Sequence, residues 1–233
     1  MLRFIRLFAI LSFISLSVIF SACGVSTAEP HSKSDANRPL VKPKAVTDRP
    51  KIVAFGDSLT AGFGLAEKDS YPYLLQKNLD SDGYNYEVVN AGVSGETSLG
   101  GLERIDWVLE QDNIDILVLE LGANDLLRGL PVAKMKENLG TIIKKAKAKN
   151  VKVLLCGMLA PETMGATYQR DYVMAFPDLA SEHKVEFLPF VLENIALKKE
   201  LNQADGIHPN AEGSKIMTAN IYKSLKPMLS EKQ

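Results

Sequence analysis

Five short apolar stretches rich in β-branched residues alternate with longer segments of helical periodicity from residue 51 onward. Two of the stretches, 114–119 and 151–155, are apolar at almost every position, which is typical of strands covered on both faces. Such alternation predicts a parallel sheet with helices on both sides. We therefore expect a three-layer, doubly wound, flavodoxin-like α/β fold with a five-stranded parallel sheet. The expected strands are 51–55, 86–90, 115–121, 151–157 and 185–189, and the expected helices are 71–79, 99–111, 131–149, 168–182 and 211–225.

Small, polar or nucleophilic residues follow several of the expected strands. In parallel sheets ligands bind beyond the carboxyl ends of the strands, so these residues are the first candidates for chemistry. Taken singly, each segment could be a helix cap or a turn. Together they bring a serine, an asparagine and an Asp-x-x-His pair to one edge of the sheet. The segments are 56–62 after the first strand, 90–95 after the second, 122–125 after the third and 205–210 beyond the fifth.

The four segments resemble the sequence blocks of the SGNH, or GDSL, hydrolases, which are named for a serine, a glycine, an asparagine and a histidine. The corresponding residues in this chain are Ser58, Gly92, Asn124 and His208, and Asp205 precedes the histidine by three positions. The similarity extends from the first expected strand to the last expected helix. The resemblance implies a serine hydrolase that needs no cofactor.

Within that family, segments 56–62, 121–129 and 205–210 look most like those of the periplasmic arylesterase, thioesterase I and lysophospholipase L1 group. This likeness implies cleavage of acyl esters, acyl thioesters or lysophospholipids. A carbohydrate O-acetylesterase of the same family is an alternative. A flavodoxin-like binding lipoprotein without activity is a second alternative, although it leaves the Asp-x-x-His pair without a role.

The residue types fit acyl transfer on chemical grounds. A serine hydroxyl such as that of Ser58 becomes a good nucleophile when a neighbouring base takes its proton. Histidine as a residue type suits this task near neutral pH, so His208 is the candidate base, and the carboxylate of Asp205 can fix its tautomer. The backbone N–H groups of Ser58 and Gly92 and the side-chain amide of Asn124 are the expected donors to the oxyanion.

An acyl chain also needs an apolar groove beside the nucleophile. Segments 126–130 and 159–164, which follow the third and fourth strands, are rich in Leu, Met and Pro. They could equally be ordinary loop-packing segments. The expected lining residues are Leu126, Leu127, Ala160, Pro161 and Met164.

Two other hydrolase classes fit poorly. The Gly-x-Ser-x-Gly elbow of α/β-hydrolases is interrupted because Thr60 stands at its last position. A metal hydrolase would need clustered His or Cys ligands, and the whole chain has three His and two Cys. We therefore expect no metal site.

The N-terminus has the pattern of a secretory signal. Arg3 and Arg6 precede an uncharged apolar run, 7–20, which is short for a membrane span. The following Phe20-Ser21-Ala22-Cys23 resembles the lipobox of bacterial lipoproteins, although Phe20 stands where that motif usually has Leu. An ordinary cleaved signal with an incidental cysteine is the alternative. The expected boundaries are 1–22 for a lipoprotein-type signal peptide, 23–50 for a flexible linker from lipidated Cys23 and 51–233 for the hydrolase domain.

These features predict an exported enzyme, either anchored to a membrane by a lipid on Cys23 or periplasmic or secreted. The net charge of −1 gives no electrostatic reason to expect nucleic acid as a partner. Nothing in the sequence indicates oligomerisation, so we expect a monomer. The other cysteine, Cys156, lies in an apolar strand and is interpreted as a buried hydrophobic residue.

Overall fold

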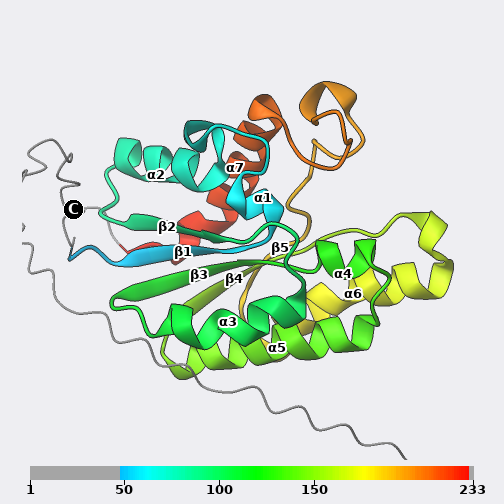
Figure 1. The fold of residues 1–233 in the computed structure, drawn as a ribbon. Coiled ribbons are helices and arrows are strands. Elements are labelled where there is room, and N and C mark those ends of the chain that lie inside the picture. Colours follow the sequence, from blue (N-terminus) through cyan, green and yellow to red (C-terminus); the bar gives the residue numbers. More distant parts are fainter. Residues whose placement is uncertain (1–47, 231–233) are drawn as a thin grey trace, which may run out of the picture. The chain divides into compact units, whose positions relative to one another are not determined.

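A five-stranded, all-parallel sheet with strand order β2-β1-β3-β4-β5 forms the centre of the domain (Figure 1). The computed structural model describes residues 48–230, so the predicted signal peptide and nearly all of the predicted linker lie outside the described residues. The predicted fold is confirmed. The strands are β1 (Lys51–Gly56), β2 (Glu87–Gly92), β3 (Ile114–Glu120), β4 (Lys152–Cys156) and β5 (Glu186–Leu188).

Helices cover both faces of the sheet. In Figure 1, α2 (Tyr71–Asp82) and α7 (Ala211–Leu225) lie on one face, while α3 (Ser98–Leu109), α5 (Val132–Ala148) and α6 (Ala166–His183) lie on the other. Two short helices, four 3₁₀ turns and their loops complete the described chain. These are α1 (Ser58–Ala61), α4 (Ala123–Leu127), η1 (Glu67–Asp69), η2 (Glu162–Met164), η3 (Lys199–Leu201) and η4 (Lys226–Met228).

The predicted elements are all present, with ends that differ by up to three residues. The last helix, α7, has the predicted bounds, because the side chain of Asn210 accepts hydrogen bonds from the N–H groups of Glu212 and Gly213 at its start, both at 3.0 Å. The helices α1 and α4 were not predicted. Each is about one turn long, which is too short to show a helical period.

The core lies between the sheet and the two helical layers. The three central strands are almost wholly buried, as their near-continuous apolarity predicted. Cys156 is a free, buried thiol, which confirms its interpretation as a core residue. Within residues 48–230, no helix is long and apolar enough to cross a bilayer.

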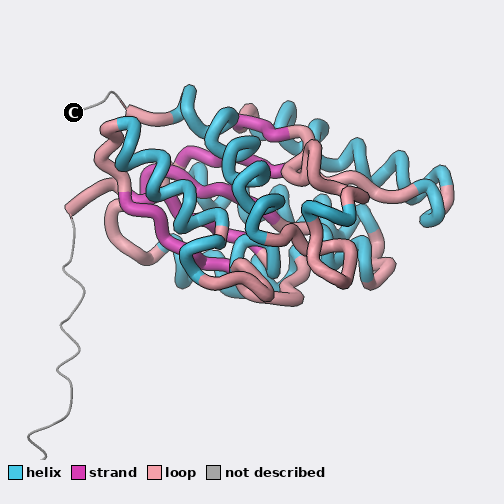
Figure 2. Tube along the Cα trace, turned by 90° about the horizontal axis from the view of Figure 1, so that it is seen from above, coloured by secondary structure: helices cyan, strands magenta, loops and turns pink. Residues whose placement is uncertain are grey.

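The register of the sheet aligns the ends of three strands. Gly56 of β1 pairs with Gly92 of β2 on one side and with Glu120 of β3 on the other. The chain therefore leaves all three strands at the same level, and the loops gather at that end of the domain (Figure 2). This edge carries the candidate site.

Candidate active site

Ser58 is the first residue of α1, which begins directly after β1. The preceding Asp57 caps this helix, since its Oδ1 accepts a hydrogen bond of 3.1 Å from Leu59 N. The helix ends at Gly62, which adopts a left-handed conformation with a φ of 77°. The serine is thereby held at the edge of the sheet by the tight strand-to-helix turn.

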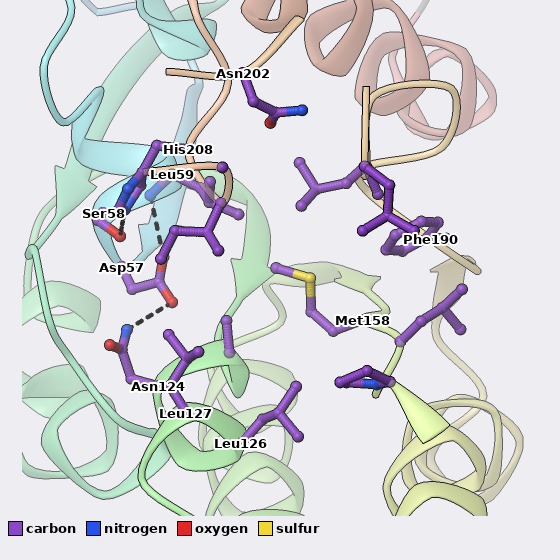
Figure 3. A pocket seen from close by; sticks show the side chains of 18 of the residues that line it. Asp57, Ser58, Leu59, Asn124, Leu126, Leu127, Met158, Phe190, Asn202 and His208 are labelled. Carbon is purple, nitrogen blue, oxygen red and sulfur yellow. Dashed lines mark hydrogen bonds between the residues drawn. The ribbon is translucent and has the colours of Figure 1, made fainter. Parts of the chain in front are cut away.

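The hydroxyl of Ser58 lies within hydrogen-bond distance of His208, with 2.8 Å between Oγ and Nε2 (Figure 3). On the other side of the imidazole, Nδ1 lies 2.7 Å from Oδ2 of Asp205. Oδ1 of Asp205 accepts the N–H groups of Ile207 at 3.0 Å and His208 at 3.1 Å. The structure therefore brings together the three residues that the sequence singled out.

The electrostatics favour one tautomer of the histidine. The hydrogen bonds from the side chain and backbone of His208 lower the pKa of Asp205 to about 2. The carboxylate is therefore ionised near neutral pH and can only accept, so Nδ1 carries a proton. In the neutral imidazole, Nε2 is left as an acceptor for the hydroxyl of Ser58.

The loop that carries Asp205 and His208 is tied to the loop after α1 by Gln203. The backbone N–H of Gln203 donates to His208 O at 2.7 Å. Its side-chain amide donates to Phe63 O at 2.7 Å and to Pro209 O at 3.0 Å. The ring centroid of Phe63 lies 4.8 Å from that of His208. These contacts fix the imidazole against a segment almost 150 positions earlier in the chain.

Asn124, at the start of α4, also faces this site (Figure 3). Its Nδ2 donates to Oδ2 of Asp57 at 3.0 Å, which fixes the amide beside the nucleophile. Burial raises the pKa of Asp57 to about 6. Asp125 points elsewhere: its Oδ2 accepts the N–H of Ser98 at 2.8 Å, and its Oδ1 accepts the hydroxyl of Ser98 at 2.6 Å. Asp205 is therefore the carboxylate that contacts the histidine.

Gly92 does not fit the predicted role of oxyanion donor. Its N–H is bonded to Oδ1 of Asn90 at 3.0 Å. A Cβ on Gly92 would lie 2.2 Å from Ala61 N, so the glycine is required by the close packing of β2 against α1. It also lines a separate groove beside Val93 and Trp107. Close packing is sufficient to account for a glycine at this position.

A nearby glycine has a free donor instead. Gly95 lies in a turn closed by the bond from Glu96 N to Val93 O at 3.1 Å, and has a φ of 81°. Among the described residues its N–H has no hydrogen-bond partner. Its carbonyl accepts from Arg128 Nη2 at 2.6 Å, which ties the turn to the end of α4. The sequence analysis did not include Gly95, although a glycine at this turn could have indicated it.

The GDSL-like lipase/acylhydrolase family matches residues 54–216 of the chain. This chain belongs to that family. Its α/β fold and its activity as an ester hydrolase are thereby established at the level of the family, as the four sequence blocks predicted.

Several members of the family are similar over most of the chain. Esterase TesA of Pseudomonas aeruginosa is 38% identical over 178 residues, which are 76% of this chain and 89% of that protein. Thioesterase 1/protease 1/lysophospholipase L1 of Escherichia coli K12 is 35% identical over 179 residues, which are 77% of this chain and 85% of that protein.

Solved structures of family members are also similar to this chain. The crystal structure of TesA has a TM-score of 0.74 and 38% identity, and the match covers 77% of this chain and 99% of that one. The SGNH-hydrolase family esterase AlinE4 has a TM-score of 0.66 and 40% identity, with 80% of this chain and 100% of that one covered. Those two solved chains consist of little more than the matched domain, so a GDSL domain of this extent folds as an independent unit.

An apolar cavity of about 350 Å³ opens beside Ser58 in this GDSL hydrolase. Four of the five predicted lining residues are there: Leu126, Leu127, Pro161 and Met164. Ala160 is not, because it is buried in the core and its carbonyl accepts from Gln169 Nε2. The sequence analysis missed lining residues from the loop just after β4, from α6 and from the segment after β5. These include Met158, Tyr172, Phe190 and Leu192.

Within the described residues, no group of three or more His, Cys, Asp or Glu side chains could hold a metal ion.

Glu120 is a second buried carboxyl beneath the nucleophile loop. It is the last residue of β3 and is fully buried. Its Oε2 accepts the hydroxyl of Thr60 at 2.8 Å, and that hydroxyl lies 3.2 Å from the hydroxyl of Tyr71. Its Oε1 has no partner among the described residues. Burial, and then the charge of Asp57, raise the pKa of Glu120 well above its usual value.

Glu120→Gln tests this interpretation through stability. A raised folded pKa means that the folded state keeps the Glu120 proton while the unfolded chain loses it above about 4.5. Wild-type stability should therefore fall relative to Glu120→Gln by up to ~1.4 kcal/mol for each pH unit between about pH 5 and the folded pKa. Urea unfolding of both proteins at about pH 5 and about pH 7 measures the difference.

The exposed Glu103→Gln controls for loss of one negative charge. A difference in free energy of unfolding between wild type and Glu120→Gln that is the same at both pH values would contradict the buried, protonated carboxyl.

Proposed function

We propose that Ser58 is the nucleophile of a two-step hydrolysis of acyl esters and thioesters, with His208 as general base and Asp205 as its charge partner. The continuous line of contacts from Ser58 Oγ through the imidazole to Asp205 Oδ2 carries this proposal. Serine hydrolases of unrelated folds use the same arrangement, in which the carboxylate orients the histidine and stabilises its protonated form.

In the first step His208 Nε2 takes the hydroxyl proton while Ser58 Oγ bonds to the substrate's carbonyl carbon. The tetrahedral intermediate then expels the alcohol or thiol, which receives the proton from His208. In the second step the imidazole deprotonates a water molecule that attacks the acyl-enzyme. The carboxylic acid leaves and Ser58 regains its proton.

The oxyanion of this intermediate needs hydrogen-bond donors. We assign the backbone N–H of Ser58, the side-chain amide of Asn124 and the N–H of Gly95. Asp57 engages the Nδ2 of Asn124, and the second proton on this nitrogen is available to the substrate. The turn of Gly95 follows β2, and its carbonyl accepts a hydrogen bond from Arg128 directly after α4, the helix that carries Asn124. Loss of one such donor typically reduces the rate about 10²–10³-fold.

The proposed substrates are esters or thioesters of medium-length acyl chains, including lysophospholipids. The cavity beside Ser58 is about 350 Å³ and its lining is mostly aliphatic, with Leu126, Met158 and Leu192 among the side chains. Such a lining favours an acyl chain over a sugar-bound acetyl group, which would need polar partners for its hydroxyls. The names of the relatives, esterase, arylesterase and thioesterase 1/lysophospholipase L1, span the same range of acyl substrates.

A chain-length series of p-nitrophenyl esters tests this proposal. We expect kcat/KM to rise from acetate to hexanoate and octanoate, because each added methylene is removed from water in the cavity. Ser58→Ala should lower kcat by about 10⁴–10⁶-fold on every ester. Steady-state release of p-nitrophenol measures both.

Ser181→Ala, which alters an exposed serine near the end of α6, is the matched control and should keep wild-type rates. Activity confined to acetate would favour the O-acetylesterase alternative. Equal, background-level rates for wild type and Ser58→Ala would favour the binding lipoprotein.

We also propose that residues 1–22 are an export signal of the lipoprotein type and that Cys23 carries a lipid. The charged start, the apolar run and the small residues before Cys23 support this. A single acyl chain gives only weak attachment, so stable anchoring needs more than one acyl group or a second contact with the membrane.

Cys23→Ser should move the enzyme from the membrane fraction to the soluble fraction, as measured by esterase activity after cell fractionation. Cys156→Ala, which removes the other cysteine, should leave the distribution unchanged. If Cys23→Ser stays with the membranes in the wild-type proportion, the lipid anchor is wrong.

A further inference from the structure

Large apolar side chains stand exposed around the mouth of the active-site cavity. Leu197 is 98% exposed, Leu127 62%, Leu159 48% and Ile207 47%, and all four line the opening. They come from four segments: the end of α4, the loop after β4, the loop after β5 and the loop that carries the Asp-x-x-His pair. We call these four residues the apolar rim.

Leu197 is held in the solvent by its surroundings. Its φ of 64° lies in the left-handed region, which is unfavourable for a leucine. The side-chain amide of buried Asn202 donates to both Ile195 O and Lys198 O, each at 2.8 Å, and so clamps the backbone on either side. Ile195 itself is fully buried. The left-handed backbone of Leu197 and the hydrogen bonds from the Asn202 amide together hold this leucine side chain in the solvent.

Hydrogen bonds also fix the backbone at or next to two other rim residues. The N–H of Ile207 is bonded to the carboxylate of Asp205 at 3.0 Å. Leu127 ends α4, and the next residue, Arg128, is bonded to Gly95 O. The rim is therefore a preformed surface. Clustered, exposed apolar side chains on a soluble domain mark a surface that binds another molecule.

The position of the rim limits what can cover it. A protein partner or a second copy of the chain seated on these four side chains would close the entrance to Ser58. A lipid surface would cover the same side chains and supply acyl chains through the same opening. Exposed charges of both signs adjoin the rim, including Arg128, Lys198, Lys199, Glu162 and Asp205. This mixture suits zwitterionic headgroups as well as anionic ones.

We infer that the apolar rim docks on a lipid surface and that the enzyme takes its substrates from that surface. This inference rests on the proposed hydrolysis of acyl esters, which requires a cavity that admits acyl chains. Docking would bury side chains of the rim among the lipids, and the acyl chain of a lysophospholipid could pass from the membrane into the cavity with little exposure to water.

Binding to vesicles of phosphatidylcholine tests the inference without catalysis. The domain of residues 48–233 carrying Ser58→Ala should bind the vesicles, and it cannot hydrolyse a substrate. Adding Leu197→Asn should lower the partition coefficient about tenfold, because burial of one leucine side chain is lost. Adding Leu127→Asn as well should lower it about 100-fold. Co-sedimentation with the vesicles measures these values.

Asparagine tolerates the left-handed backbone at position 197, so Leu197→Asn should keep the fold, which circular dichroism checks. Trp107→Asn is the matched control, since Trp107 is 67% exposed on α3 and lies outside the rim. Its partition coefficient should stay within about twofold of the parent's.

Three results would overturn the inference. The parent domain could fail to bind vesicles, Trp107→Asn could lose as much binding as Leu197→Asn, or Leu197→Asn could convert a dimer into a monomer in size-exclusion chromatography. In each case p-nitrophenyl ester turnover by the wild-type domain decides separately whether the proposed hydrolysis stands.

Discussion

The hydrogen bond between Ser58 and His208 is the constraint on which the site depends, because it joins residues 150 positions apart. The sheet register fixes the position of Ser58 at one end of this bond, because Ser58 lies two residues after Gly56, where three strands end at one level. Gln203 sets the other end through its bonds to Phe63 O and Pro209 O. A displacement of either loop by about 1 Å would weaken proton transfer, which requires hydrogen-bond contact.

This arrangement is supported by polar groups that are costly to bury. Asp57 at the start of α1 and Glu120 beside Thr60 of that helix are both buried, and burial raises the pKa of both carboxyls. Asp57 caps the helix that carries the nucleophile and holds Asn124, while Glu120 holds Thr60. Burying these carboxyls destabilises the fold, and the apolar core around the sheet offsets that cost. Such a balance is common at active sites. Leu197, at the cavity mouth, is a further unfavourable feature that the fold must offset, because its backbone is strained.

The sequence predicted the features that depend on local sequence patterns. Strand–helix alternation predicted the sheet, and Ser58, Asp205 and His208 could be found because chemistry in such folds sits at strand ends. Gly92 was misassigned because the sequence does not reveal that the Asn90 side chain occupies its N–H. Ala160 was misassigned because neighbouring residues of one loop can face opposite ways. Glu120 was missed because it lies near the end of the predicted strand 115–121 and its burial depends on packing by distant segments.

Covalent labelling tests most directly whether Ser58, His208 and Asp205 act together. An alkyl p-nitrophenyl phosphonate reacts with an activated serine by forming an Oγ–P bond and releasing p-nitrophenolate. Peptide mass analysis should find one adduct, on Ser58, and its rate of formation should fall at least about 10³-fold in His208→Ala. Labelling at another residue, or labelling of Ser58 at the wild-type rate without His208, would contradict the account.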